Sequence, residues 1–253
     1  MKGRVIITGA SSGIGRSLAI EFASKGYALG LTARRYELLK ELQLEIKEMF
    51  GESIQVELRV LDVTMYREIS RVLKELTYAL GGLDILVVNA GVARAQFVGT
   101  GAFLQDKTVI ETNLIGAIAT VDSGLEIIRQ GKRQGQIVGI SSIAGIRGFA
   151  GNASYSASKA GFTTYLEALR AETQGENIQI TTILPGFIDT PMNSHMPERP
   201  FVITVREGAK RILSLIERRV NVAVVPTFPW IFIAWLLKWL PDFLFLKLKL
   251  KEK

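Results

Sequence analysis

The 253-residue sequence contains no cysteine and a single histidine, His195. Without cysteine the chain can form neither a disulfide nor a thiolate metal site, which is consistent with a reducing compartment. One histidine cannot build a multi-histidine metal site, so we expect no metal centre. We interpret His195 as an exposed loop residue, with contact to a substrate as the alternative.

We expect neither a leader nor a membrane-spanning run in this sequence. Strand-like residues 4–7 follow the first three residues directly, so we expect no signal peptide. The apolar run at residues 229–237 is far shorter than the roughly 20 residues of a spanning helix. The net charge is +7, but no basic cluster interleaved with aromatic residues occurs, so nucleic acid is not an expected partner. We expect a cytoplasmic protein.

Short apolar, β-branched runs alternate with amphipathic helical patterns along most of the chain. The pattern predicts strands over residues 5–8, 28–32, 54–61, 85–89, 136–141, 178–184 and 222–225. It predicts helices near 14–25, 36–49, 65–80, 104–130, 153–174 and 205–218. Continuous apolar strands separated by helices are typical of a parallel sheet covered on both faces. We predict an α/β, Rossmann-type doubly wound fold with a seven-stranded, mainly parallel sheet.

The first predicted strand leads into a glycine-rich turn, Thr8-Gly9-Ala10-Ser11-Ser12-Gly13-Ile14-Gly15. Glycines at a strand-to-helix turn let the backbone approach a pyrophosphate closely, and N–H groups at the start of the helix meet its charge. The turn therefore predicts a dinucleotide site. A plain tight turn capped by a serine is the alternative.

The second predicted strand ends in Ala33-Arg34-Arg35. An acidic residue here would bind the ribose hydroxyls of NAD, whereas an arginine accommodates a 2′-phosphate. The pattern therefore favours NADP(H) over NAD(H), with solvated charge at a helix start as the alternative. Asp62, followed by Val63 at the end of the third strand, is suited to accept a hydrogen bond from an adenine amino group or to cap the next helix.

Small and polar residues stand where the fourth and fifth strands end. Asn89-Ala90-Gly91 offers small residues against which a ribose or nicotinamide could lie. Ser141 and Ser142 place hydroxyls at the carboxyl edge of the sheet, where doubly wound folds bind ligands. Asn113 lies in the long apolar helix between them, where an amide is usually a hydrogen-bonded packing residue.

Tyr155 and Lys159 are four residues apart in a predicted helix, so their side chains lie on one face. A phenol with a pKa of about 10 is a poor acid or base at neutral pH. A nearby ammonium group favours the phenolate and lowers that pKa. The pair is therefore a candidate acid/base, although many surface helices carry the same spacing by chance.

Together these residues resemble the short-chain dehydrogenase/reductase family in its common single-domain form. The matching positions, in family order, are Gly9-x-x-x-Gly13-x-Gly15, Asp62, Asn89-Ala90-Gly91, Asn113, Ser142, Tyr155-x-x-x-Lys159 and Pro185-Gly186. The resemblance covers residues 4 to about 226. It implies an oxidoreductase that moves hydride between a nicotinamide and a carbonyl or carbinol carbon.

The resemblance also implies roles for the matched residues. Tyr155 would donate or remove the proton on the substrate oxygen, Lys159 would lower the Tyr155 pKa and bind the nicotinamide ribose, and Ser142 would hold the oxygen. Asn113 would orient a water that links Lys159 to solvent. Cofactor contacts are implied at Gly9, Ser11, Ser12, Gly13, Ile14, Gly15, Arg34, Arg35, Asp62, Val63, Asn89, Ala90, Gly91, Tyr155, Lys159, Pro185, Gly186, Ile188 and Thr190.

In this reading residues 1–228 form one NAD(P)-binding catalytic domain, with a substrate lid at about 187–205. Two methionines, Phe201, Val202 and Ile203 in the lid favour an apolar substrate, because methionine adapts to such ligands. Many relatives pair through the helices that carry Asn113 and Tyr155, so a homodimer or homotetramer is expected.

Residues 229–253 lie beyond the resemblance. This tail holds all three tryptophans and ends in alternating lysines, namely Trp230, Trp235, Trp239, Lys247, Lys249, Lys251 and Lys253. Clustered tryptophan with terminal lysine indicates a helix lying in the interface of an anionic membrane. We therefore expect an amphipathic tail in peripheral contact with the cytoplasmic face of a membrane. Packing on another subunit or on the chain's own core is the alternative.

The sequence thus predicts an NADP-dependent reductase of a hydrophobic, lipid-like carbonyl compound, with a place in lipid metabolism. Candidate substrates are lipid-like 3-ketones such as 3-ketosphinganine or 3-oxoacyl chains, steroids and retinoids. The alternative from another class is a sensor or scaffold that binds NADP and recruits a partner without turnover. The intact Ser142, Tyr155 and Lys159 argue against it, because binding alone gives no chemical need for them.

Overall fold

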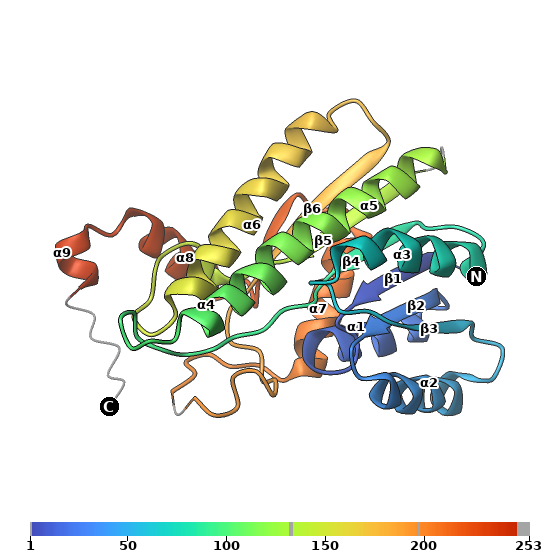
Figure 1. The fold of residues 1–253 in the computed structure, drawn as a ribbon, viewed down its shortest axis with the longest axis horizontal. Coiled ribbons are helices and arrows are strands. Elements are labelled where there is room, and N and C mark those ends of the chain that lie inside the picture. The colour runs from blue at the N-terminus through green and yellow to red at the C-terminus, as the bar shows by residue number, and fades with distance from the viewer. Residues whose placement is uncertain (1, 132–133, 197, 247–253) are drawn as a thin grey trace.

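The computed structural model describes residues 2–131, 134–196 and 198–246. A central sheet of seven strands lies between two layers of helices (Figure 1). The strand order is β3-β2-β1-β4-β5-β6-β7, and every neighbouring pair is parallel. This confirms the predicted α/β, Rossmann-type doubly wound fold.

The elements follow the alternation that the sequence predicts. The strands are β1 (Arg4–Thr8), β2 (Ala28–Ala33), β3 (Val56–Val60), β4 (Ile85–Val88), β5 (Gly135–Ile140), β6 (Ile178–Pro185) and β7 (Val222–Val225). The longer helices are α1 (Gly13–Ser24), α2 (Tyr36–Phe50), α3 (Tyr66–Leu80), α4 (Phe103–Ile110), α5 (Gly116–Gln130), α6 (Ala153–Glu172), α7 (Val205–Glu217) and α8 (Trp230–Trp239). Three short helical turns complete the set: η1 (Glu111–Ile115), η2 (Ile143–Gly145) and α9 (Asp242–Phe245).

Each face of the sheet has its own apolar core. Val5 and Ile7 of β1 pack with α1, α2 and α7, whereas Ile6 between them packs with α3, α5 and α6. Successive side chains of a strand point to opposite faces, so one strand contributes to both cores. Figure 1 shows α1, α2 and α7 on one side of the sheet and α3, α5 and α6 on the other.

The long helix predicted at residues 104–130 is divided. A π-helical turn, η1, separates α4 from α5 and contains Asn113. Single π-helical turns inside α-helices often occur at functional sites. The periodicity of the apolar residues did not indicate this interruption, because the three elements follow one another without a break in helical backbone.

The tail begins after β7 with α8 and α9. Trp230 and Leu237 of α8 are buried, while Ile231, Trp235 and Trp239 are exposed. The helix is therefore apolar on the side that packs on the domain and on the side that faces solvent. In the part of the chain described here, no helix combines the length and apolar composition that crossing a bilayer requires. The terminal lysines, residues 247–253, lie outside the described residues.

Candidate active site

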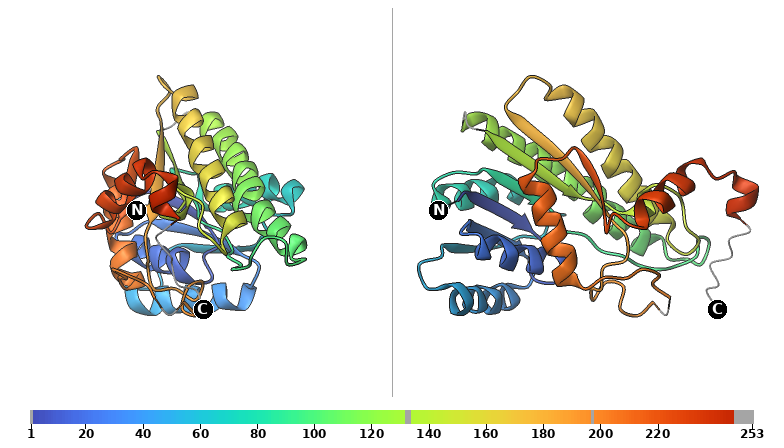
Figure 2. Two further views of the ribbon diagram at one scale, coloured as in Figure 1. Left: turned by 90° about the vertical axis from the view of Figure 1, so that its left-hand side faces the viewer. Right: turned by 180° about the vertical axis from the view of Figure 1, so that it is seen from behind.

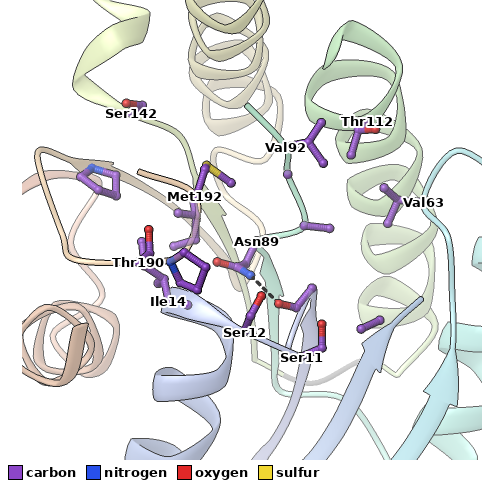
Figure 3. Close-up of a pocket in the computed structure, with 18 of the residues that line it drawn as sticks. Ser11, Ser12, Ile14, Val63, Asn89, Val92, Thr112, Ser142, Thr190 and Met192 are labelled. Atoms are coloured by element: carbon purple, nitrogen blue, oxygen red, sulfur yellow. Dashed lines mark hydrogen bonds between the residues drawn. The ribbon is translucent and has the colours of Figure 1, made fainter. Parts of the chain in front are cut away.

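The candidate site lies at the carboxyl edge of the sheet, where the strand order reverses. β1 pairs with β2 on one side and with β4 on the other, so the turns that follow β1 and β4 meet there. Doubly wound folds bind ligands in the crevice at such a switch point. A pocket at this place is shown in Figure 3, with residues of both turns among its lining.

The glycine-rich turn after β1 is tightly packed. Gly9 has a φ of +69°, and a Cβ there would lie 2.7 Å from the Cα of Ala90. A Cβ on Gly15 would lie 2.6 Å from the carbonyl oxygen of Gly9. The turn therefore excludes side chains at both positions and brings bare backbone to the start of α1. Free N–H groups at a helix start favour an anion, so this cradle fits a pyrophosphate.

Asn89 ties the two turns together. Its side-chain amide donates to the carbonyl oxygens of Thr8 at 2.9 Å and Gly9 at 3.2 Å. The hydroxyl of Thr8 accepts from the backbone N–H groups of Asn89 at 3.1 Å and Ala90 at 3.2 Å. In Figure 3 Asn89 lies between the serines of the glycine-rich turn and Thr190. These bonds fix the floor of the pocket.

Arg34, Arg35 and the carboxylate of Asp62 line the part of the pocket next to the ends of β2 and β3. Arg35 donates through Nη2 to the hydroxyls of Ser11 and Ser12, each at 2.9 Å. Arg34 lies 3.8 Å from a carboxylate oxygen of Asp62, and its side chain is 63% exposed. The other oxygen of Asp62 accepts from the backbone N–H and the hydroxyl of Thr64. Asp62 therefore fixes the turn before α3 and also lines the pocket.

Tyr155 and Lys159 lie on one face of α6, as their spacing predicts. Lys159 is buried and donates through Nζ to the carbonyl oxygen of Ile140 at 2.8 Å. Burial lowers the pKa of Lys159 to about 8. Burial raises the pKa of Tyr155, and a hydrogen bond with Ser142 opposes that rise. The direction differs from the expectation that Lys159 lowers the Tyr155 pKa, because desolvation of the phenol dominates.

The segment after β5 is locked to α6 beside these residues. The hydroxyl of Ser141 donates to the carbonyl oxygen of Lys159 at 3.0 Å and lies 2.7 Å from the hydroxyl of Thr163. A Cβ on Gly145 would lie 2.8 Å from the carbonyl carbon of Lys159. This close contact between η2 and α6 keeps the segment that carries Ser142 against the helix that carries Tyr155, and both residues line the pocket.

Asn113 lies behind the pocket and does not line it. Its amide oxygen accepts from the N–H of Val92, and its amide nitrogen donates to the carbonyl oxygen of Val92, both at 2.8 Å. The amide nitrogen is also 3.3 Å from the hydroxyl of Ser158. Asn113 is only 1% exposed. The π-helical turn thus presents a satisfied amide that anchors the segment after β4.

The turn after β6 closes the remaining side of the pocket. Asn193 accepts through Oδ1 from the backbone N–H of Thr190 at 3.2 Å and donates through Nδ2 to the carbonyl oxygen of Ile188 at 2.9 Å. The sequence placed Asn193 only within the expected lid, and its bonds to Thr190 and Ile188 show that it also shapes the wall of the pocket. Thr112 and Val92 line the pocket as well and were not predicted, whereas Met192, expected in the lid, is also in the lining.

The structure gathers almost all of the expected residues around one pocket. Those that line it are Gly9, Ser11, Ser12, Gly13, Ile14, Arg34, Arg35, Asp62, Val63, Asn89, Ala90, Gly91, Ser142, Tyr155, Lys159, Pro185, Gly186, Ile188 and Thr190. Gly15 and Asn113 are not among the lining residues. Gly15 acts beneath the turn, where only a glycine fits. His195 lies in the segment after Thr190, is exposed as expected, and is not among the lining residues.

Comparison with known proteins matches this chain to oxidoreductases. The model of the short chain dehydrogenase family matches residues 3–200. An uncharacterized oxidoreductase of Mycobacterium tuberculosis is 36% identical over 228 residues, which cover 90% of this chain and 89% of the relative. A 3-oxoacyl-acyl-carrier-protein reductase of Thermotoga maritima is 35% identical over 202 residues, covering 79% and 80%. The crystal structure of levodione reductase is similar with a TM-score of 0.80, 26% identity and coverage of 89% and 96%.

Proposed function

Because the chain belongs to the short-chain dehydrogenase family of oxidoreductases, we propose that it reduces a carbonyl group of a hydrophobic, lipid-like substrate with NADPH. Oxidation of the corresponding alcohol is the reverse of the same reaction. The observation that carries the proposal is the meeting of Ser142, Tyr155 and Lys159 in the pocket that the glycine-rich turn also lines. A dinucleotide cradle and an acid/base group thus share one site.

The side chains have complementary roles in this reaction. A bound nicotinamide cofactor supplies the hydride. Ser142 donates a hydrogen bond to the substrate oxygen and polarises the carbonyl. Tyr155 gives its phenolic proton to that oxygen, and its raised pKa keeps it protonated for this task. The ammonium of Lys159 stabilises the phenolate that remains. Asn113 positions the segment after β4 beside Lys159.

The preference for NADPH rests on the two arginines at the adenosine end. No acidic residue follows β2, and the guanidinium groups of Arg34 and Arg35 flank the pocket. Arg35 also donates hydrogen bonds to the hydroxyls of Ser11 and Ser12, which line the pocket beside it. A guanidinium binds a phosphate through several donors at once, whereas ribose hydroxyls of NADH offer no charge to meet it.

The apolar side chains next to Ser142 and Gly186 support an apolar substrate. Ile143 next to Ser142 and Phe187 next to Gly186 pack in one apolar cluster with Leu184, Trp230 and Leu237. The lid adds exposed Met192, Phe201 and Val202. Long-chain 3-ketones, steroids and retinoids all carry a carbonyl on an extended hydrocarbon body. These apolar side chains fit such a body.

We propose that the same end of the molecule rests on a membrane. Because all strands are parallel, the loop after β4, the lid after β6 and the tail after β7 all leave the carboxyl edge of the sheet. Figure 2 shows these segments at one end of the molecule. Each exposes large apolar residues, namely Phe97, Val98, Phe103, Leu104, Phe201, Val202, Phe228, Ile231, Phe232, Trp235, Leu236, Trp239, Phe243, Leu244 and Leu246.

The chemistry of this surface fits a lipid interface better than a protein partner. Tryptophan is enriched at the level of lipid headgroups, and Trp235 and Trp239 are more than half exposed on α8. Lys238 lies between them in the chain, and four more lysines follow within residues 247–253. Basic residues beside an apolar face attract anionic lipid. We propose a peripheral position at the cytoplasmic face, and a homo-oligomer paired through α5 and α6.

The test is NADPH oxidation in detergent against lipid-like 3-ketones, steroids and retinal, with Tyr155→Phe as the blank. Turnover of one substrate class that disappears in the variant supports the proposed reaction. Tight NADPH binding without turnover of any member would instead favour the sensor or scaffold function.

A further inference from the structure

Trp230 joins the tail to the catalytic domain at Gly186, which lines the candidate cofactor site. It is the first residue of α8 and is 6% exposed. Its indole lies on the backbone of Gly186, where a Cβ would be 2.5 Å from two ring atoms. Gly186 lines the pocket on its other side. One layer of backbone therefore separates the tail from the candidate cofactor site.

The same indole contacts both ends of the lid, which we call the outgoing arm (residues 187–189) and the returning arm (residues 201–203). Phe187 on the outgoing arm packs edge-on at 5.7 Å between ring centroids, and Phe201 on the returning arm does so at 6.4 Å. The arms are joined by hydrogen bonds from Ile203 to Phe187 at 3.1 Å and from Asp189 to Ile203 at 2.9 Å. Phe201 has a φ of +54°, an unfavourable value for a residue with a side chain. Trp230 thus packs at the base of the lid.

The opposite side of α8 faces solvent. Ile231, Trp235 and Trp239 are exposed, and in the proposed function they meet lipid. The ten residues of α8 form one hydrogen-bonded helix. A force that orients its exposed side therefore also orients Trp230, and with it Gly186 and the two phenylalanines.

We propose that Trp230 is a positioning residue that couples membrane docking of α8 to the order of residues 186–196 and 198–204 over the site. This inference rests on the proposed membrane contact and names its regulatory consequence. Docking fixes α8, and the indole then holds the turn and both lid arms in place. Because coupling between two binding events is reciprocal, lipid and NADPH raise each other's affinity by the same factor. For typical coupling energies that factor is about tenfold.

The first experiment measures amide hydrogen exchange in residues 186–204, with and without anionic phosphatidylserine-containing vesicles and without a carbonyl substrate. In the wild type, vesicles slow exchange in this segment. In Trp230→Ala the vesicles still bind, but exchange in 186–204 stays fast, while exchange in β1 and β4 is unchanged and shows that the fold is intact. Trp230→Phe keeps an aromatic ring there and restores part of the slowing. Equal slowing in wild type and Trp230→Ala overturns the proposal.

A second experiment tests the contact with Gly186 directly through the NADPH dissociation constant. Gly186→Ala introduces a methyl group that meets the indole, so it weakens NADPH binding in the wild-type background. In Trp230→Ala the same methyl group has space, so Gly186→Ala adds little further loss. Strictly additive losses contradict the proposed contact.

The reciprocal factor completes the test. Vesicle affinity is measured with and without NADPH, and NADPH affinity with and without vesicles. Equal factors above one in the wild type, and factors of one in Trp230→Ala, support the coupling. A protein that binds NADPH and lipid independently refutes it, even if it reduces the proposed substrate. Failure to bind lipid at all refutes the membrane contact and the coupling together, and leaves the reductase proposal standing.

Discussion

The ammonium of Lys159 lies 2.8 Å from the carbonyl oxygen of Ile140, the last residue of β5. This contact holds a buried charge at the carboxyl edge of the sheet, one helical turn from Tyr155. Burial lowers the pKa of Lys159 to about 8 while it raises the pKa of Tyr155. The two groups are therefore both protonated at neutral pH, and Lys159 is the first to lose its proton as the pH rises.

We predict that kcat/KM for carbonyl reduction is level near neutral pH and falls above about pH 8. Loss of the Lys159 proton removes the charge that stabilises the Tyr155 phenolate during proton donation. The measurement is kcat/KM against pH, because this ratio reports the pKa values of the free enzyme. A profile that stays level well above that pH would separate Lys159 from the proton transfer.

We predict that Lys159→Met makes the folded protein more stable at neutral pH while it removes activity. The pKa of Lys159 falls from its ordinary 10.5 to about 8 in the folded protein, so the unfolded chain binds more protons between these values. Wild-type stability therefore rises with pH through this window, and the cost of burying the ammonium is fully present below it.

The expected gain for Lys159→Met is on the order of 2 kcal/mol near neutral pH. It is the difference between roughly 3 kcal/mol for the pKa change and about 1 kcal/mol for the lost bond to Ile140. Urea unfolding at neutral pH and at about pH 10 measures the gain, which shrinks at the higher pH. A gain that is independent of pH would indicate better packing rather than relief of a buried charge.

We predict that Tyr155→Phe reduces turnover by at least about a thousandfold, because the proton donor to the substrate oxygen is lost. The phenyl ring keeps the shape of the site, so NADPH still binds. Turnover and the NADPH dissociation constant are measured on the same preparation. Retained turnover would remove Tyr155 from its role, and a large loss of NADPH affinity would show that the change disturbs more than the proton transfer.

We predict that Arg34→Ala and Arg35→Ala each lower the preference for NADPH over NADH by about tenfold, through loss of charge-assisted bonds to the 2′-phosphate. The measurement is the ratio of kcat/KM for the two cofactors. Arg206→Ala is the matched control, because this guanidinium is 78% exposed on α7 and does not line the pocket. An unchanged ratio in Arg34→Ala would mean that Arg34 does not select the cofactor.

The sequence predicted those parts of the fold and site that depend on local pattern. The parallel sheet follows from continuous apolar strands, and the pocket follows from the residues at their carboxyl ends. Two features could not be predicted in this way. The π-helical turn at Asn113 follows α4 and precedes α5 without a break in the helical backbone, so residues 104–130 read as one helix in the sequence. The net direction of the Tyr155 pKa depends on burial by segments far apart in the chain.

The roles of the three tryptophans in the tail could not be predicted from the sequence either. Trp230, Trp235 and Trp239 are indistinguishable as letters in an apolar run, yet one is buried against Gly186 and two are exposed. Only the packing of α8 on Leu184 and Ile143 separates their roles. A test of membrane contact by deleting residues 229–253 would therefore remove the indole behind the pocket as well, and would confuse binding with catalysis.

A sharper test changes only the exposed side of α8. We predict that Trp235→Glu with Trp239→Glu abolishes flotation with vesicles that contain phosphatidylserine, because each change removes a large interfacial side chain and adds a charge that anionic lipid repels. Tyr78→Glu is the matched control, since Tyr78 is 90% exposed on α3, away from the tail. NADPH affinity without vesicles stays unchanged, because Trp230 is intact. Flotation that survives the double change would place the contact elsewhere, and flotation lost equally in Tyr78→Glu would reduce it to net charge.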